Sequence, residues 1–534
     1  MLIALVLLCA TLTIPSVQTF AGKQVTAFLS KKMDAKLSVD KLRINWDLTI
    51  VAKGIRIEDQ HGNNLISAPL AQLDFPIFKH RYLEINHICV DSADVCLRTY
   101  QGENDFNLRF FIDFFKNDKV KQEKMVVNFN FLQLKNSKFQ LRNDNTAYED
   151  EDNLWNYQNM VITGINTKMK QLLIVGDSLN FFIDELQAKE RSGFELTTFQ
   201  GHLQLSQIGL YCFDTKFQTA NNSEFDLDFG FDFKNGYQSF KNFFEDISFN
   251  TFLYPSTLNT KDLTYFVKSF AGLEDNVLVQ SRVHGPLSDI KFDSTIVNIG
   301  SQTKLSAHIN MAGLPTIEET FIDLTVNDLM LNMNDITAFR LPKNKRIVLP
   351  KKIQVLHWAK AKGHFIGLYN NFFADAVFFT NIGNGSCELM LNNQKKPLSY
   401  DGKINVEHLA LGKILDTDKF GTLSLSTKIK GQGISFVTMN TYIDGSVSEI
   451  DFNGTNIKNI DLNGRILAKQ FNGQVACQDT NLKIDFNGLV DFNGDEPKYD
   501  FIAQIEHINL SEMRLFRPDS NVCFRADKIG RAHV

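Results

Sequence analysis

The alternation of apolar and polar residues at every second position constrains this chain more than any other feature. In FDLDFGFDF (225–233), the Phe and Leu residues fall on one side of an extended strand and the Asp residues on the other. The segments VNFNF (127–131), LKIDF (482–486) and YDFIAQIEHI (499–508) alternate in a similar way. Strands with one apolar and one polar face are typical of antiparallel sheets. The sequence therefore predicts a mainly β protein of antiparallel strands from about residue 37 onward.

The dipeptide Asn-Gly recurs at 453–454, 463–464 and 472–473. Asn-Gly is the strongest short hairpin signal, because both central residues of a type I′ turn have positive φ. We therefore predict a long meander of short strands that turns about every ten residues. Some of the glycines instead mark bulges that curve the sheet.

A sheet with one apolar face must either cover that face or leave it open. The 534 residues are too many for one hydrophobic core, and 46 of them are Phe. A two-layer sandwich would close the apolar face, whereas a single sheet curled into a trough would leave it able to hold acyl chains. The residues expected to line such a trough are Phe129, Phe131, Phe225, Leu227, Phe229, Phe231, Phe233, Leu482, Ile484 and Phe486.

The N-terminal segment MLIALVLLCATLTI (1–14) carries no charge and ends before Pro15. A membrane-spanning helix needs about 20 apolar residues, and a signal peptide has a shorter apolar region. A positively charged start and a small-residue cleavage site are both absent, so we interpret 1–14 as part of a transmembrane anchor. A complete signal peptide is the alternative, and both place the bulk of the chain outside the cytoplasm.

Residues 15–36 are predicted to form an amphipathic helix that leads into the first strand. Its apolar residues fall on one side at helical spacing, and they are Val17, Phe20, Ala21, Ala27, Phe28 and Leu29. This side either packs against the first strand or lies on the surface of a bilayer. A few short helices are expected further along, at 260–270 and 333–339.

The sequence carries no motif for chemistry. Phosphate-binding loops, Gly-x-Ser-x-Gly and His-Glu-x-x-His are absent, and the 11 His are scattered. A net charge of -5 without a basic stripe argues against nucleic-acid binding. We therefore expect no enzyme, no cofactor and no metal site.

Seven cysteines occur without a Cys-x-x-Cys pair. Cys89 and Cys96 lie symmetrically about Ser92-Ala93, so a two-residue hairpin would set them opposite each other. A disulfide between them is compatible with an oxidising compartment, although the register would place them at a hydrogen-bonded pair with the wider Cα separation. The sequence leaves their pairing open.

Several segments resemble TamB-like proteins of Bacteroidetes-type bacteria, within the AsmA-like group. PSVQTFAGKQVTAFLSKKMDAKLSVDKLRI (15–44) resembles the start of that family, and LTIVAKGIRIEDQHGNNLISAPLAQLDF (48–75) resembles its next element. Residues 253–273 and 309–336 resemble its middle segments, and 462–492 resembles a later repeat. The order and spacing of these segments, over about 15 to 525, carry the resemblance.

The resemblance implies an elongated antiparallel repeating β-groove, a U-shaped sheet with an apolar inner face. In that arrangement 1–14 would be a partial transmembrane anchor, 15–36 the amphipathic helix, 37–120 an AsmA-like N-terminal β region and 121–527 the repetitive groove. The final residues KIGRAHV (528–534) resemble a translated sequencing adapter.

The resemblance further implies an inner-membrane protein with its bulk in the periplasm of a diderm bacterium. Its expected function is to carry phospholipid between the inner and outer membranes, with acyl chains along the trough. The alternatives are an assembly factor for outer-membrane or autotransporter proteins and a structural spacer. Family members are longer and engage an outer-membrane β-barrel partner through a C-terminal domain, which we expect to lie outside this chain.

Overall fold

The computed structural model describes most of the chain. The described residues are 14–33, 35–110, 125–146, 153–348, 354–394, 396–435, 437–494, 496, 498–509, 512–514 and, for the backbone, 523–529. They form mostly strands with a few short helices, which confirms the mainly β prediction. The chain divides into two compact units, Met1–Pro286 with Arg340–Lys345 and Leu287–Phe339 with Arg346–Val534. The predicted anchor, 1–14, lies outside the described residues except for Ile14.

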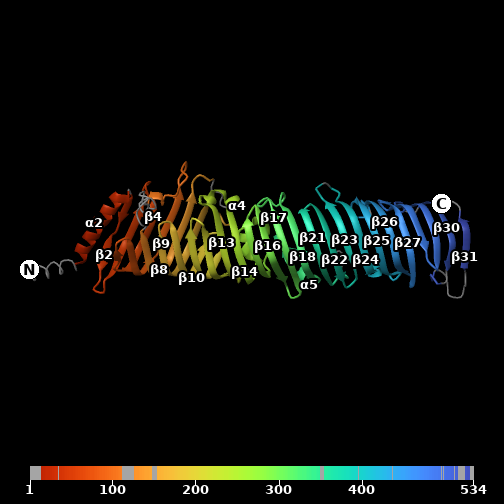
Figure 1. Ribbon diagram of the computed structural model, residues 1–534, viewed down its shortest axis with the longest axis horizontal. Helices are drawn as coiled ribbons and strands as arrows, with labels where there is room; N and C mark the ends of the chain where they lie inside the picture. The colour runs from red at the N-terminus through yellow and green to blue at the C-terminus, as the bar shows by residue number, and fades with distance from the viewer. Residues whose placement is uncertain are drawn as a thin grey trace, which may run out of the picture. The chain divides into compact units, whose positions relative to one another are not determined.

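The first unit begins with helix α2 (Pro15–Met33) and continues as a sheet (Figure 1). Its strands are β1 (Lys36–Ser38), β2 (Lys41–Ile44), β3 (Thr49–Glu58), β4 (Asn64–Asp74), β5 (Ile77–Lys79), β6 (Tyr82–Asp91), β7 (Asp94–Thr99), β8 (Val126–Asn143), β9 (Asn159–Val175), β10 (Ser178–Glu190), β11 (Glu195–Ser206), β12 (Gly209–Thr219), β13 (Glu224–Tyr237), β14 (Ile247–Asn259) and β15 (Asn276–Pro286). Short helices are η1 (Gln238–Asn242), α4 (Phe243–Asp246), η2 (Thr260–Tyr265) and η3 (Lys268–Phe270).

The second unit is again a sheet with short helices. Its strands are β16 (Asp289–Ile299), β17 (Thr303–Ala312), β18 (Phe321–Asn332), β21 (Trp358–Leu368), β22 (Asn371–Thr380), β23 (Gly383–Asn392), β24 (Ser399–Ala410), β25 (Phe420–Gln432), β26 (Asn440–Phe452), β27 (Thr455–Leu467), β28 (Gln470–Gln478), β29 (Leu482–Asp491), β30 (Lys498–Asn509) and β31 (Cys523–Ile529). Its helices are α5 (Met333–Ala338) and α6 (Leu411–Leu415); between β18 and β21 the chain also forms β19 (Arg340–Leu341), η4 (Pro342–Asn344) and β20 (Lys345–Arg346).

From β8 onward in each unit, the long strands that follow one another in the sequence pair antiparallel, which confirms the predicted meander. Apart from the short β19 and β20, the strands from β8 to β30 run for 9 to 18 residues, so most are longer than a turn every ten residues allows. One region departs from the pattern. Strands β6 and β7 run parallel to β8 and antiparallel to β4.

Only one of the three predicted Asn-Gly turns is a turn. Asn453 and Gly454 both have positive φ and join β26 to β27. Asn463-Gly464 instead lies inside β27 and Asn472-Gly473 inside β28. The turn between those strands is formed by Ala468 and Lys469, with φ of 43° and 66°.

The alternation of the strand explains the Asn-Gly pair inside β27. Asn463 lies on the polar face and donates from Nδ2 to Asp444 Oδ1 at 3.0 Å. Gly464 lies on the apolar face, where a Cβ would come within 2.7 Å of the Phe471 ring. Glycine is therefore required at this position for packing of a neighbouring aromatic ring and not for a turn.

The chain does not form a two-residue hairpin at Ser92-Ala93. Cys89 pairs with Gln133 and Cys96 with Gln140, so β6 and β7 continue along the same neighbouring strand. Seven residues of strand separate these partners by roughly 23 Å, which excludes a disulfide. Both cysteines are free.

Bulges interrupt the strands at several positions where a residue within the strand has positive φ and the register shifts. At four of them, the backbone N–H of this residue donates to a side chain of the next strand. The pairs are Asn136 with Asn166 (2.9 Å), Asp214 with Asp228 (2.7 Å), Ser294 with His308 (3.3 Å) and His408 with Ser424 (3.0 Å). Bulges bend a strand, so they curve the sheet while these side chains satisfy the freed N–H groups.

Helix α2 confirms the predicted helix over most of 15–36, and it covers the edge of the sheet beside β2 (Figure 1). Thr19 Oγ1 accepts from the Leu42 N–H at 3.2 Å and donates to the Leu42 carbonyl at 3.1 Å. Gln18 bonds Ile44 and Ser30 bonds Leu37 in the same two-way manner. Polar side chains of the helix thereby bond backbone N–H and carbonyl groups at this edge, which could otherwise pair with another strand.

We expect Thr19→Val to expose this edge. Valine has the shape of threonine but leaves the Leu42 N–H and carbonyl without their partner, which should cost about 1 kcal/mol of unfolding free energy. Hydrogen exchange should accelerate at the Leu42 amide. Thr26→Val is the matched control, because Thr26 Oγ1 donates only within the helix, to Lys23. Equal exchange at Leu42 in both variants would contradict the role of Thr19.

Candidate functional site: the apolar face of the sheet

Residues that pair across neighbouring strands lie on the same face of the sheet. The strand register therefore identifies the residues of the candidate site. In the first unit Leu210 pairs with Phe231 and Phe231 with Phe249, while Cys212 pairs with Phe229. Phe231 and Phe249 meet edge to face with ring centroids 5.1 Å apart. Aromatic pairs in this geometry add stabilisation beyond the burial of their area. The face is thus continuous across β12, β13 and β14.

The same arrangement recurs in the second unit. Ile484 pairs with Cys477 on one side and Ile505 on the other, and Phe486 pairs with Val475 and Ala503. The ring of Phe486 lies 5.0 Å from that of Phe501. Residues of opposite polarity occupy the alternate positions, so each strand contributes apolar side chains to one face only.

The structure brings nine of the ten sequence-predicted lining residues onto apolar faces. The five of β13 share one side of their strand, and Leu482, Ile484 and Phe486 share one side of β29. Phe129 pairs with Leu172 and with the buried Ile85.

Phe131 is the exception, because it lies on the opposite face. It pairs with Lys170, which pairs in turn with Phe182, and its ring stacks on His87 at 4.9 Å. Lys170 forms an ion pair with Asp184, which marks this face as the polar one. Gln171 has positive φ, and the strand changes face around it. We therefore do not count Phe131 among the lining residues.

Glycine and small residues complete the apolar face, a signal that the search for Phe missed. Gly464 and Gly473 stand opposite each other between β27 and β28. Ala374 and Ala376 of β22 pair with Leu389 and Cys387 in the same rows as the larger side chains. These residues could have been found by extending the period-two pattern through glycine and alanine.

Three cysteines of this face have thiol groups that are partly shielded from water. Burial raises the pKa of the Cys212, Cys387 and Cys477 thiols above the usual value for cysteine. Each has an apolar cross-strand neighbour, respectively Phe229, Ile404 and Ile484. Removal of water from around a group disfavours its charged form, so these thiols stay protonated to higher pH.

Most side chains of the apolar face are nevertheless half-buried and not fully buried. Among the described residues, Ile457, Cys477 and Met513 form a buried cluster where Met513 covers the face. A large part of the apolar face therefore has no covering layer in the described part of the chain.

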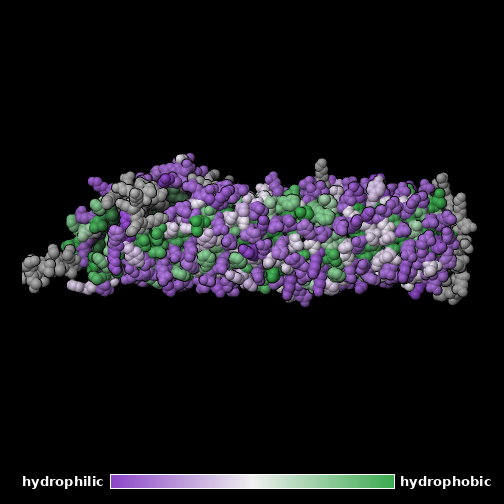
Figure 2. Space-filling view, in the orientation of Figure 1, coloured by the Kyte–Doolittle hydropathy of each residue, from purple (hydrophilic) through white to green (hydrophobic). Residues whose placement is uncertain are grey.

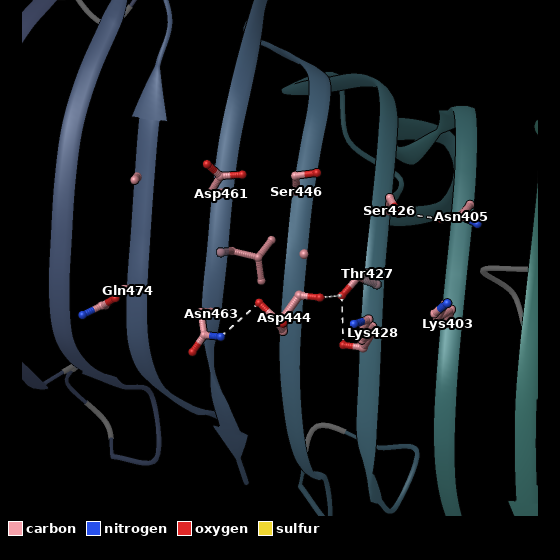
Figure 3. A pocket seen from close by; sticks show the side chains of 13 residues that line it. Lys403, Asn405, Ser426, Thr427, Lys428, Asp444, Ser446, Asp461, Asn463 and Gln474 are labelled. Carbon is pink, nitrogen blue, oxygen red and sulfur yellow. Dashed lines mark hydrogen bonds between the residues drawn. The ribbon is translucent and has the colours of Figure 1, made fainter.

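The opposite face is polar. Figure 2 shows hydrophilic side chains over much of the surface in view, with apolar side chains between them. A shallow depression of about 690 Å³ lies on this face over β24 to β28 (Figure 3). Its side chains bond mainly one another: Ser426 Oγ donates to Asn405 at 2.6 Å, and Asn463 to Asp444. This depression has the composition of a solvated surface.

The described residues contain no group of three or more His, Cys, Asp or Glu side chains arranged to hold a metal ion. They also contain no helix long and apolar enough to cross a membrane.

Comparison with known proteins identifies no relative: no family model, curated protein or solved structure matches this chain.

Tyr211 provides a test of the electrostatics on the polar face. Burial, and then its hydrogen bond to Asp232 Oδ1 at 2.5 Å, raises the pKa of Tyr211 to about 12. A raised pKa stabilises the fold below the unfolded value, near 10, and this contribution is lost as the pH rises toward 12. We expect Tyr211→Phe to lower the free energy of unfolding by about 1 kcal/mol at neutral pH. The deficit should disappear in the alkaline window.

Unfolding of the two proteins between pH 7 and pH 12, followed by circular dichroism, measures this difference. Tyr442→Phe is the control, since Tyr442 is exposed and its ring contact with Arg465 survives the change. A pH-independent deficit in Tyr211→Phe would contradict the assignment.

Proposed function

We propose that this chain carries phospholipid between the inner and outer membranes of a diderm bacterium, with acyl chains held on the apolar face of the sheet. The observation that supports this proposal is the apolar face, whose side chains continue from strand to strand and are mostly half-buried in each unit. Together with the resemblance of the sequence to TamB-like and AsmA-like proteins, it favours a lipid path over a site for a reaction.

The energetics suit such a path. Burial of an acyl chain yields about 0.8 kcal/mol per CH₂ and depends little on the geometry of the surface. Successive strands present similar apolar rows, for example Leu462, Val475 and Phe486. A lipid that moves by one strand therefore exchanges one apolar contact for an equivalent one, without a deep minimum along the way.

The finer features of the proposal follow the resemblance. The sheet would be a U-shaped trough, and the bulges at Asp214, Ser294 and His408 supply curvature of the kind that this requires. Residues 1–14 would anchor the chain in the inner membrane, 37–120 would form the AsmA-like N-terminal region, and 121–527 the repetitive groove. An outer-membrane β-barrel would be a partner of the protein.

Two other functions compete with this one. An assembly factor would accept strands of outer-membrane or autotransporter proteins at a sheet edge. At the edge formed by β1 and β2, the side chains of Gln18, Thr19 and Ser30 already occupy the backbone groups, which disfavours strand addition there. A structural spacer would close its apolar face on itself, and the half-buried side chains disfavour that arrangement.

Charge on the apolar face should abolish lipid binding. We expect the chain from Pro15 onward, secreted to a bacterial periplasm and purified without detergent, to retain phospholipid detectable by mass spectrometry. Phe231→Asp in the first unit and Ile484→Asp in the second should each lower the lipid content several-fold, because burying a carboxylate among acyl chains is costly.

Phe213→Asp is the matched control, because Phe213 lies on the polar face beside His202 and is already exposed. Circular dichroism identifies any variant that fails to fold. Unchanged lipid content in folded Phe231→Asp and Ile484→Asp, or a folded parent without lipid, would move the assignment to an assembly factor or a spacer.

A further inference from the structure

Helix α2 packs on the sheet with a mainly polar side, although Met33 at its end is buried as well. Gln18 is buried, and a Cβ at Gly22 would lie 3.1 Å from Leu42 Cδ1, so the helix approaches β2 closely. Thr19 and Ser30 bond β2 and β1 from the same side. Of the six apolar residues expected on one side of this helix, only Leu29 is half-buried, so packing of that side on the first strand fails for the other five. The edge of a sheet needs hydrogen bonds more than apolar contacts.

The apolar side of α2 is consequently exposed. Phe20 is 64% exposed, Val25 57% and Phe28 62%. Ile14 and Val17, at the start of the helix, are exposed as well. A row of large apolar side chains on a single exposed helix is rare on a soluble surface and marks a site of interaction.

The charges on this helix indicate which partner its exposed apolar side binds. Residues 15–33 include Lys23, Lys31 and Lys32 but no Asp or Glu. The exposed row is also continuous in sequence with the uncharged segment 1–14. This composition matches the interface of a membrane that contains anionic lipid. Acyl chains there contact the apolar residues, and the negatively charged headgroups attract the lysines.

We propose that α2 lies in the interface of an anionic phospholipid bilayer, with Phe20 and Phe28 in the acyl region and Lys23 and Lys31 near the headgroups. The hydrogen bonds from Gln18, Thr19 and Ser30 then hold the first strands of the sheet against the membrane surface. The inference does not rest on lipid transport, since an assembly factor or a spacer would be seated in the same way.

Photocrosslinking in the full chain tests this placement. A p-benzoylphenylalanine replaces Phe20, Phe28 or, as a control, Ile208, which is exposed in the turn between β11 and β12. Each protein is reconstituted in vesicles of phosphatidylethanolamine and phosphatidylglycerol and illuminated. Adducts are then identified by mass spectrometry. We expect phospholipid adducts at positions 20 and 28, several-fold above those at 208.

The other outcomes overturn the proposal. Adducts from position 20 to segment 1–13 would show that the preceding segment covers the helix, and adducts to a second copy would show a dimer interface. Lipid adducts no more abundant than at 208 would show that this face does not reach the bilayer. Because the probe is a phenylalanine derivative at an exposed position, the parental circular dichroism spectrum should be retained in each protein.

Discussion

The structure depends on one constraint, the continuation of apolar side chains from strand to strand along one face of the sheet. Backbone hydrogen bonds to both neighbouring strands satisfy the polar groups of the main chain, so a sheet can extend strand by strand. The apolar rows then extend with it, as Cys477, Ile484 and Ile505 do across β28, β29 and β30. In the described residues little covers these rows. A half-buried apolar face favours the lipid ligand that we propose, because acyl chains need no specific contacts.

Backbone N–H and carbonyl groups that form no hydrogen bond to a neighbouring strand are hydrogen-bonded by side chains instead. At the bulges, polar residues of the following strand accept from the freed N–H groups, as Asp228 does for Asp214. At the first edge, Thr19 and its neighbours in α2 act as a substitute strand. The same device therefore permits curvature within the sheet and closes one edge. Its consequence at α2 is that the apolar side of the helix faces outward.

The sequence was sufficient for the strand class and for most of the apolar face, because alternation at every second position acts within one strand. It was insufficient wherever the outcome depends on a neighbouring strand. Asn463-Gly464 has the composition of a turn, but the ring of Phe471 explains why glycine stands there. Phe131 continues the alternation of its segment, yet the bulge at Gln171 in the next strand accompanies its change of face. The positions of Cys89 and Cys96 likewise depend on β8, which lies far along the chain.

The most direct test of the open, lipid-holding face uses two native cysteines. Cys387 lies on the apolar face and Cys89 on the polar face, and both are half-buried and free. Their rates of reaction with a charged maleimide are measured in the protein as purified and again after lipid is extracted with cyclodextrin. The account predicts that extraction accelerates Cys387 several-fold and leaves Cys89 unchanged. Identical rates at Cys387 before and after extraction, in protein that remains folded, would contradict it.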